Sequence, residues 1–195
     1  MDTLKTERLV IRPFVSDDLQ DAHQLLDEDI GWAGPSITVE QREMKLRLYV
    51  ALANWEDTGR IYGFRALVLR DSRRMIGVCG FHPDLWSPAW KAIFWPQLFD
   101  RYDPCRMGRY ASLELGIGYA LSRQERGRGY ASEAVRAFVD HAFCQLKVGR
   151  VFATTDRDNH DSVRLMAHVG MRTATNPDRD TPWPGVVGVI ENPLL

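Results

Sequence analysis

The sequence predicts one domain built on a mixed β-sheet with helices on both faces. Its 195 residues are enough to bury a full core. Strand patterns come in pairs early in the chain and alternate with helix patterns later, which is typical of a mixed sheet covered on both sides. Because no repeat, low-complexity tract or linker divides the chain, we expect a single domain over residues 1–195.

The expected strands are short apolar or alternating segments that end at turn residues. They lie at 6–14, 62–71, 74–81, 111–121, 149–158, 171–175 and 185–192. The expected helices show apolar residues at helical spacing. They cover about 16–31, 38–55, 129–145 and 159–170.

Composition narrows the class of protein. The formal net charge of −1 argues against a nucleic-acid-binding surface spread over the whole molecule. Cys79, Cys105 and Cys144 form no C-x-x-C pair, which favours a reducing compartment over a disulfide framework or a zinc site. The five histidines show no metal-ligand spacing, and no apolar run has a membrane helix's length. We therefore expect a cytoplasmic protein with no metal and no membrane partner.

The segment 82–110 is an unusual connection between two strands. A connection of this length usually has its own structure or a function. One interpretation is a satellite core or a homodimer contact, since exposed tryptophans would favour a dimer. The other is a wall of an acceptor pocket, because aromatic side chains build ligand sites efficiently. The aromatic residues are Trp86, Trp90, Phe94, Trp95, Phe99, Tyr102 and Tyr110.

A glycine-rich turn, "QERGRGYASEA" (124–134), precedes the helix with the clearest apolar face. It is not a dinucleotide fingerprint, because Ser132 stands at the third glycine position, and it lacks the G-K-[ST] of a Walker loop. Amides at the start of a helix can bind an anion, and Gly127 and Gly129 would let a diphosphate approach. The alternative is a tight strand-to-helix turn with solvated arginines.

Two longer stretches extend this motif. Gln124-x-x-Gly127-x-Gly129 resembles the [RQ]-x-x-G-x-[GA] signature of the GNAT acyltransferase superfamily. The segment 150–171, "RVFATTDRDNHDSVRLMAHVGM", is similar to the D-x-x-N-x-x-S-x-x-x-[ML] pattern of its ribosomal-protein N-terminal (alanine) acetyltransferase branch. The first strand and helix also fit that branch, so the resemblance covers nearly the whole chain.

The resemblance implies an α+β fold, an α/β/α sandwich. Its mostly antiparallel sheet of about seven strands splays at a V between strands 111–121 and 149–158. Acetyl-CoA would lie in the gap as co-substrate. Main-chain groups of Tyr119, Ala120 and Leu121 would bind pantetheine, and the turn would hold the diphosphate. The family's other cofactor positions fall on Arg126, Gly127, Arg128, Gly129, Tyr130, Ala131, Asn159 and Ser162. Asn159 would equally serve as a helix N-cap.

In this family an amine attacks the thioester directly, without a covalent enzyme intermediate. Glu114 is our candidate base, although relatives often carry that glutamate where this chain has Gly116. Otherwise Glu114 is a surface or salt-bridged carboxylate. A main-chain N–H near Tyr119 would polarise the thioester. Some relatives carry a tyrosine acid where this chain has Met166, so Ser162 or a water would protonate the leaving thiolate.

The resemblance thus implies an acetyl-CoA-dependent N-acetyltransferase. Its acceptor would be a primary amine of a protein terminus or of a small molecule. Two alternatives stay open. One is a catalytically idle module that binds CoA, suggested by the missing tyrosine and the shifted glutamate. The other is a transferase with a longer donor such as succinyl-CoA, because the fold does not determine acyl length.

Overall fold

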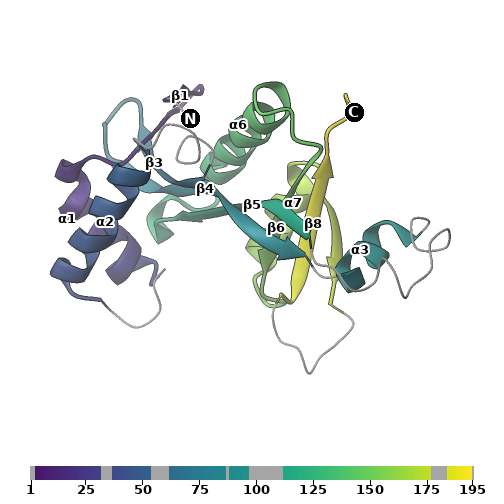
Figure 1. Ribbon diagram of the computed structural model, residues 1–195. Helices are drawn as coiled ribbons and strands as arrows, with labels where there is room; N and C mark the ends of the chain where they lie inside the picture. The colour runs from purple at the N-terminus through teal and green to yellow at the C-terminus, as the bar shows by residue number, and fades with distance from the viewer. Residues whose placement is uncertain are drawn as a thin grey trace. The chain divides into compact units, whose positions relative to one another are not determined.

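A computed structural model describes residues 3–31, 37–53, 62–86, 88–96, 112–176 and 184–194 (Figure 1). Its contacts gather into two compact units. The first unit comprises Met1–His82 and Ile117–Leu146, and the second comprises Pro83–Gly116 and Lys147–Leu195. We describe each unit by itself.

In the described residues, eight strands pair in the order β1-β2-β3-β4-β5-β6-β8-β7, and β5 contributes residues to both units. Of the strand pairs whose register the structure defines, all are antiparallel except β5 with β6, which is parallel at Gly116 and Phe152. The predicted mixed, mostly antiparallel sheet is therefore confirmed. Its strands are β1 (Leu4–Lys5), β2 (Leu9–Arg12), β3 (Gly63–Leu69), β4 (Met75–Trp86), β5 (Ser112–Leu121), β6 (Arg150–Thr155), β7 (Arg172–Thr175) and β8 (Val186–Glu191).

The extra strand β1 arises from a tight turn in the segment expected to be one strand. The N–H of Thr6 donates to the carbonyl of Leu9 at 3.0 Å, and this bond folds Leu4 and Lys5 back along β2.

The helices lie near their expected positions. The segment 16–31 is a series of three contiguous pieces: a 3₁₀ turn η1 (Ser16–Asp18), α1 (Leu19–Ala22) and a π-helix η2 (His23–Asp29). The other helical elements are α2 (Val39–Ala53), α3 (Pro88–Phe94), the 3₁₀ turn η3 (Arg123–Glu125), α6 (Tyr130–Cys144) and α7 (His160–His168). No helix among the described residues is long and apolar enough to cross a membrane.

In the first unit, alternation along the strands separates two packed faces. Val68 lies opposite Val10 on β2, and both pack in the cluster that α1 and α2 cover; these two helices lie side by side in Figure 1. Their strand neighbours point to the other face, where Phe81 meets Phe138 of α6 edge to face at 5.0 Å. Helices therefore cover both faces, as expected.

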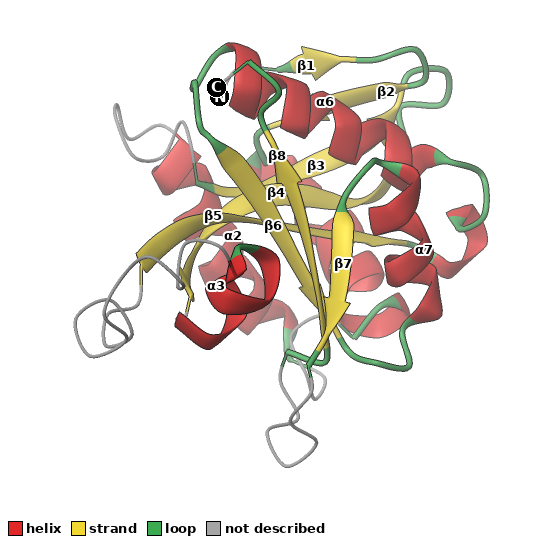
Figure 2. Ribbon diagram, turned by 90° about the vertical axis from the view of Figure 1, so that its right-hand side faces the viewer, coloured by secondary structure: helices red, strands yellow, loops and turns green. Residues whose placement is uncertain are grey.

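The second unit follows the same rule. Phe152 of β6 lies opposite Val189 of β8, and both pack against Phe94 and Trp95 at the end of α3. On the other face α7 packs against β7 and β8 (Figure 2). Gly188 is required there, because a Cβ would lie 2.9 Å from the sulfur of Met166.

The described part of segment 82–110 supports the satellite-core interpretation. Trp86, Phe94 and Trp95 are buried and Trp90 packs against them. These side chains therefore offer little surface to a partner, and the homodimer stays a prediction. Phe99, Tyr102, Tyr110 and Cys105 lie outside the described residues.

A buried ion pair joins η2 to α2. Arg42 is only 1% exposed and donates to both carboxylate oxygens of Asp27, with Nε at 2.7 Å from Oδ2. Nδ1 of His23 lies 2.9 Å from the same carboxylate. Burial alone would raise the pKa of Asp27, but the hydrogen bonds and charges of Arg42 and His23 outweigh it and lower that pKa.

We predict that Asp27→Asn lowers the free energy of unfolding by about 3–5 kcal/mol at pH 7, because it leaves the Arg42 charge buried and uncompensated. Urea denaturation measures this loss. Since the folded-state pKa of Asp27 is depressed, its contribution is present above the unfolded pKa of about 3.9 and is lost as the pH falls through the folded value. The gap between wild type and variant should therefore narrow towards pH 3.

The matched control is Glu43→Gln, which breaks an exposed pair with Arg47 and should cost at most about 1 kcal/mol. Equal losses in the two variants, or a gap that does not change with pH, would contradict the assignment.

Candidate functional site

The glycine-rich turn in the first unit adopts a conformation that other residues rarely take. Gly127 has φ of +74° and Gly129 has φ of +82°, both in the left-handed region. A Cβ on Gly127 would meet nothing within 4 Å, whereas one on Gly129 would lie 3.3 Å from Nη2 of Arg8. The chain is therefore turned sharply here, and the surface at Gly127 is open.

The turn ends at the N-terminus of α6, with Gly129 as the N-cap residue. The first helical bond runs from the N–H of Glu133 to the carbonyl of Gly129, at 3.0 Å. The amides of Tyr130, Ala131 and Ser132 therefore precede any intrahelical acceptor, and the helix dipole adds positive potential at the same end. This arrangement suits a phosphate group.

The two arginines of the turn are exposed, and each contacts another group of the protein. Nε of Arg126 donates to the carbonyl of Leu121 at 3.2 Å. Nη1 of Arg128 lies 3.2 Å from Oε2 of Glu125, the second residue of the 124–134 stretch, which is 3% exposed. The predicted basic turn thus includes a buried carboxylate that the sequence pattern did not identify as important.

A second ion pair anchors the first turn of α6 to the segment before β2. Arg8 donates to Glu133 through its main-chain N–H at 2.8 Å and through Nε at 2.7 Å, and Nη1 donates to the carbonyl of Arg128 at 2.9 Å. Burial acts to raise the pKa of Glu133, but hydrogen bonds from Thr6 and Arg8 lower it further than burial raises it. Sequence reasoning missed both residues, since they are 125 positions apart.

The expected pantetheine residues close β5 in the first unit. Tyr119 and Ala120 are half-buried, and Leu121 is buried. Gly77 of β4 permits the close approach, because a Cβ there would lie 2.3 Å from the carbonyl oxygen of Ala120. The N–H of Ser122 then donates to the carbonyl of Ile76 at 2.9 Å. The end of β5 is therefore held against β4 directly before the turn.

Asn159 and Ser162 lie in the second unit, at the start of α7. Oδ1 of Asn159 accepts from the N–H of Ser162 at 3.1 Å, so Asn159 is the N-cap that the sequence analysis weighed against a ligand role. Its side-chain oxygen is committed to the helix. A contact with a ligand could use the side-chain NH₂ group or the second lone pair of that oxygen.

Glu114, our candidate base, is paired with Arg150 in the second unit. Arg150 donates to the two carboxylate oxygens through Nε at 3.1 Å and Nη2 at 2.8 Å, and the Glu114 side chain is 10% exposed. The guanidinium of Arg150 also lies 4.6 Å from the ring centre of Trp95. The salt-bridged state that the sequence analysis left open is thus what the structure contains.

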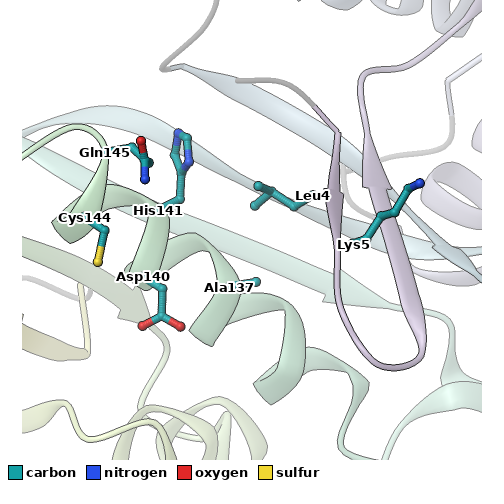
Figure 3. A pocket seen from close by; sticks show the side chains of 7 residues that line it. All are labelled: Leu4, Lys5, Ala137, Asp140, His141, Cys144 and Gln145. Carbon is teal, nitrogen blue, oxygen red and sulfur yellow. The ribbon is translucent and has the colours of Figure 1, made fainter.

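A shallow hollow of about 310 Å³ lies beside the second half of α6 (Figure 3). None of the expected site residues lines it. The residues that line the hollow are Leu4, Lys5, Ala137, Asp140, His141, Cys144 and Gln145.

Across the described segments, no group of three or more His, Cys, Asp or Glu could hold a metal ion.

We predict that Gly127→Ala lowers the free energy of unfolding by about 1 kcal/mol, because a Cβ is strained at positive φ even in open space. Gly127→Asn should lose less, since asparagine tolerates this region better. Gly149 is exposed and its φ is not positive, so Gly149→Ala serves as the control. The measurement is thermal or urea denaturation, and equal stabilities of Gly127→Ala and Gly149→Ala would contradict the prediction.

Comparison with known proteins identifies the family of this chain. A model of the acetyltransferase (GNAT) domain matches residues 8–172. The uncharacterised N-acetyltransferase p20 of Bacillus licheniformis is 27% identical over 176 residues, covering 85% of this chain and 80% of p20.

Solved structures share the fold. The ribosomal-protein-S5-alanine acetyltransferase of Vibrio fischeri superposes with a TM-score of 0.67 at 15% identity, over 99% of this chain and 98% of its own. RimL, an alpha-N-protein acetyltransferase of a ribosomal protein solved in complex with coenzyme A, has a TM-score of 0.64 at 14% identity, over 97% and 98% of the two chains. The chain accordingly belongs to the GNAT acetyltransferase family and is an N-acetyltransferase.

Proposed function

We propose that this protein transfers an acetyl group from acetyl-CoA to a primary amine by direct attack in a ternary complex. The acceptor is a protein N-terminus or a small-molecule amine. The observation that carries the proposal is the open turn at Gly127 and Gly129, whose positive φ values place free amides of α6 beside two arginines. A diphosphate matches that combination of amides and charge.

The fit of the other residues supports acetyl-CoA as the donor, which supplies a thioester to the amine. Amides from Arg126 to Ala131 would hold the diphosphate. Main-chain groups of Tyr119, Ala120 and Leu121 would receive the pantetheine amides. Following the family pattern, we assign the side chain of Asn159 to a contact with the cofactor and the hydroxyl of Ser162 to a place near the departing sulfur.

The acceptor amine must be neutral before it attacks. An α-amine of pKa about 8 costs about 1.4 kcal/mol to deprotonate at pH 7, and a lysine of pKa about 10.4 costs about 4.6 kcal/mol. A weak base is therefore enough for an N-terminus, and positioning can supply most of the rate. This difference favours α-amines over lysine side chains as acceptors.

We assign the base role to Glu114, acting through a water. Two hydrogen bonds from Arg150 orient the carboxylate, and an ionised carboxylate is an acceptor that can take up a proton. A main-chain N–H near Tyr119 would donate to the thioester carbonyl. Ser162 or a water would protonate the departing thiolate.

Two observations favour a second candidate, an idle module that binds CoA. Glu114 is engaged with Arg150, and Met166 stands where some relatives carry a tyrosine acid. A transferase using a longer donor such as succinyl-CoA is the remaining alternative.

The first test combines binding and turnover. Calorimetry should detect CoA binding, and a thiol-release assay should show faster turnover with a peptide bearing a free α-amine than with an N-terminally blocked lysine peptide. A small diamine and succinyl-CoA complete the panel of acceptors and donors. No binding of any acyl-CoA would remove the proposal, and binding without turnover on any acceptor would favour the idle module.

A second test addresses Glu114. We predict that Glu114→Gln lowers kcat by about 10²-fold or more, as expected on loss of a general base, while the Kd for CoA is unchanged. Glu43→Gln is the control, because Glu43 is a carboxylate in an exposed pair with Arg47 that does not contact the candidate site; its kcat should stay near that of the wild type. A wild-type kcat in Glu114→Gln would show that Glu114 is only a structural partner of Arg150.

A further inference from the structure

A carboxylate lies buried beside the glycine-rich turn. Glu125 ends η3 directly before the turn, is 3% exposed, and its N–H donates to the carbonyl of Ser122 at 3.0 Å. A buried carboxylate is costly unless cations or hydrogen-bond donors surround it. Its partners therefore decide which charges gather at this end of α6.

Two arginines share this single carboxylate. Arg74 comes from the segment between β3 and β4, 51 residues earlier, and Nη2 donates to Oε1. Nη1 of Arg128 lies 3.2 Å from Oε2. Among the described residues, no donor has hydrogen-bond geometry towards Oε2, so Arg128 contributes charge there without a directed bond.

The arginines near the turn differ in how far a carboxylate neutralises their positive charge. Glu133 neutralises Arg8, and Asp29 lies 3.8 Å from Arg123. Glu125 can neutralise only one of its two arginines, which are 49% and 59% exposed for Arg74 and Arg128. Within the described part of the chain, Arg126 has no carboxylate partner and donates to a carbonyl, so the first unit keeps an excess of positive charge around the turn.

We propose that Arg74 is a further phosphate-binding residue of this site, held at the turn by Glu125. The proposal rests on the proposed use of acetyl-CoA. A guanidinium can donate two parallel hydrogen bonds to a phosphate, and Arg74 uses Nη2 for Glu125 while half of its side chain faces solvent. The motif contains Arg126 and Arg128 but not Arg74, which only folding brings to the turn.

Calorimetry with CoA, dephospho-CoA and phosphate-free acetyl-pantetheine tests the assignment. We predict that Arg74→Ala weakens CoA binding by about 10- to 100-fold, the range for a charge-assisted hydrogen bond, and leaves acetyl-pantetheine unaffected. A loss that persists with dephospho-CoA identifies the diphosphate as the contact. A loss confined to CoA identifies the 3′-phosphate.

The controls separate phosphate binding from simple charge balance. Arg47→Ala removes an exposed arginine of α2 and should leave the Kd for CoA unchanged. Because Arg74→Ala leaves Glu125 less compensated, the double variant Arg74→Ala, Glu125→Gln is compared with Glu125→Gln alone. If Arg74 binds phosphate, the double variant binds CoA at least about 10-fold more weakly than the single one. Equal affinities would overturn the inference.

Failure of this inference is distinguishable from failure of the proposed function. If wild type binds CoA and Arg74→Ala binds it equally well, only the role of Arg74 is wrong. If wild type binds no acyl-CoA at all, the proposed function is wrong and the inference fails with it.

Discussion

The left-handed turn at Gly127 and Gly129 is the constraint on which the proposed acetyl-CoA site depends. Two positive φ values within three residues reverse the chain before α6 and leave its first amides without helical acceptors. Any side chain at either position would be strained. The same backbone therefore stops the 3₁₀ turn η3, starts the helix and presents N–H groups at an open surface.

Ion pairs between distant segments hold this turn in the first unit. Arg8 contacts Glu133 and the carbonyl of Arg128, and Arg74 contacts Glu125. Each of the two carboxylates is largely buried, so each needs its cation for stability. The same arginines that stabilise the turn are therefore the ones that the proposed phosphate site would use, and the exposed ones would be available to it.

Aromatic packing plays the corresponding part in the second unit. Trp95 lies against the guanidinium of Arg150, its indole N–H donates to Glu191 at 2.8 Å, and Arg150 orients Glu114. Trp95 of the segment 82–110 is therefore linked to the candidate base Glu114 through Arg150. The segment's described aromatic residues support the sheet around Glu114, which gives the satellite core a connection to the proposed chemistry.

Local patterns in the sequence determined the strands, the helices and the motif, because periodicity and glycine placement are properties of neighbouring residues. These patterns did not predict β1, which a turn from Thr6 to Leu9 folds back along β2. The sharp turn at Gly127 and Gly129 could be predicted, because left-handed backbone is strained for other residues and this cost is local. Only the tertiary structure decided that Glu125 is buried, that Arg74 meets it, and that Glu114 is paired with Arg150. Burial and charge pairing join residues far apart in the chain, and no local pattern encodes which carboxylate will lose its water and which arginine will replace it.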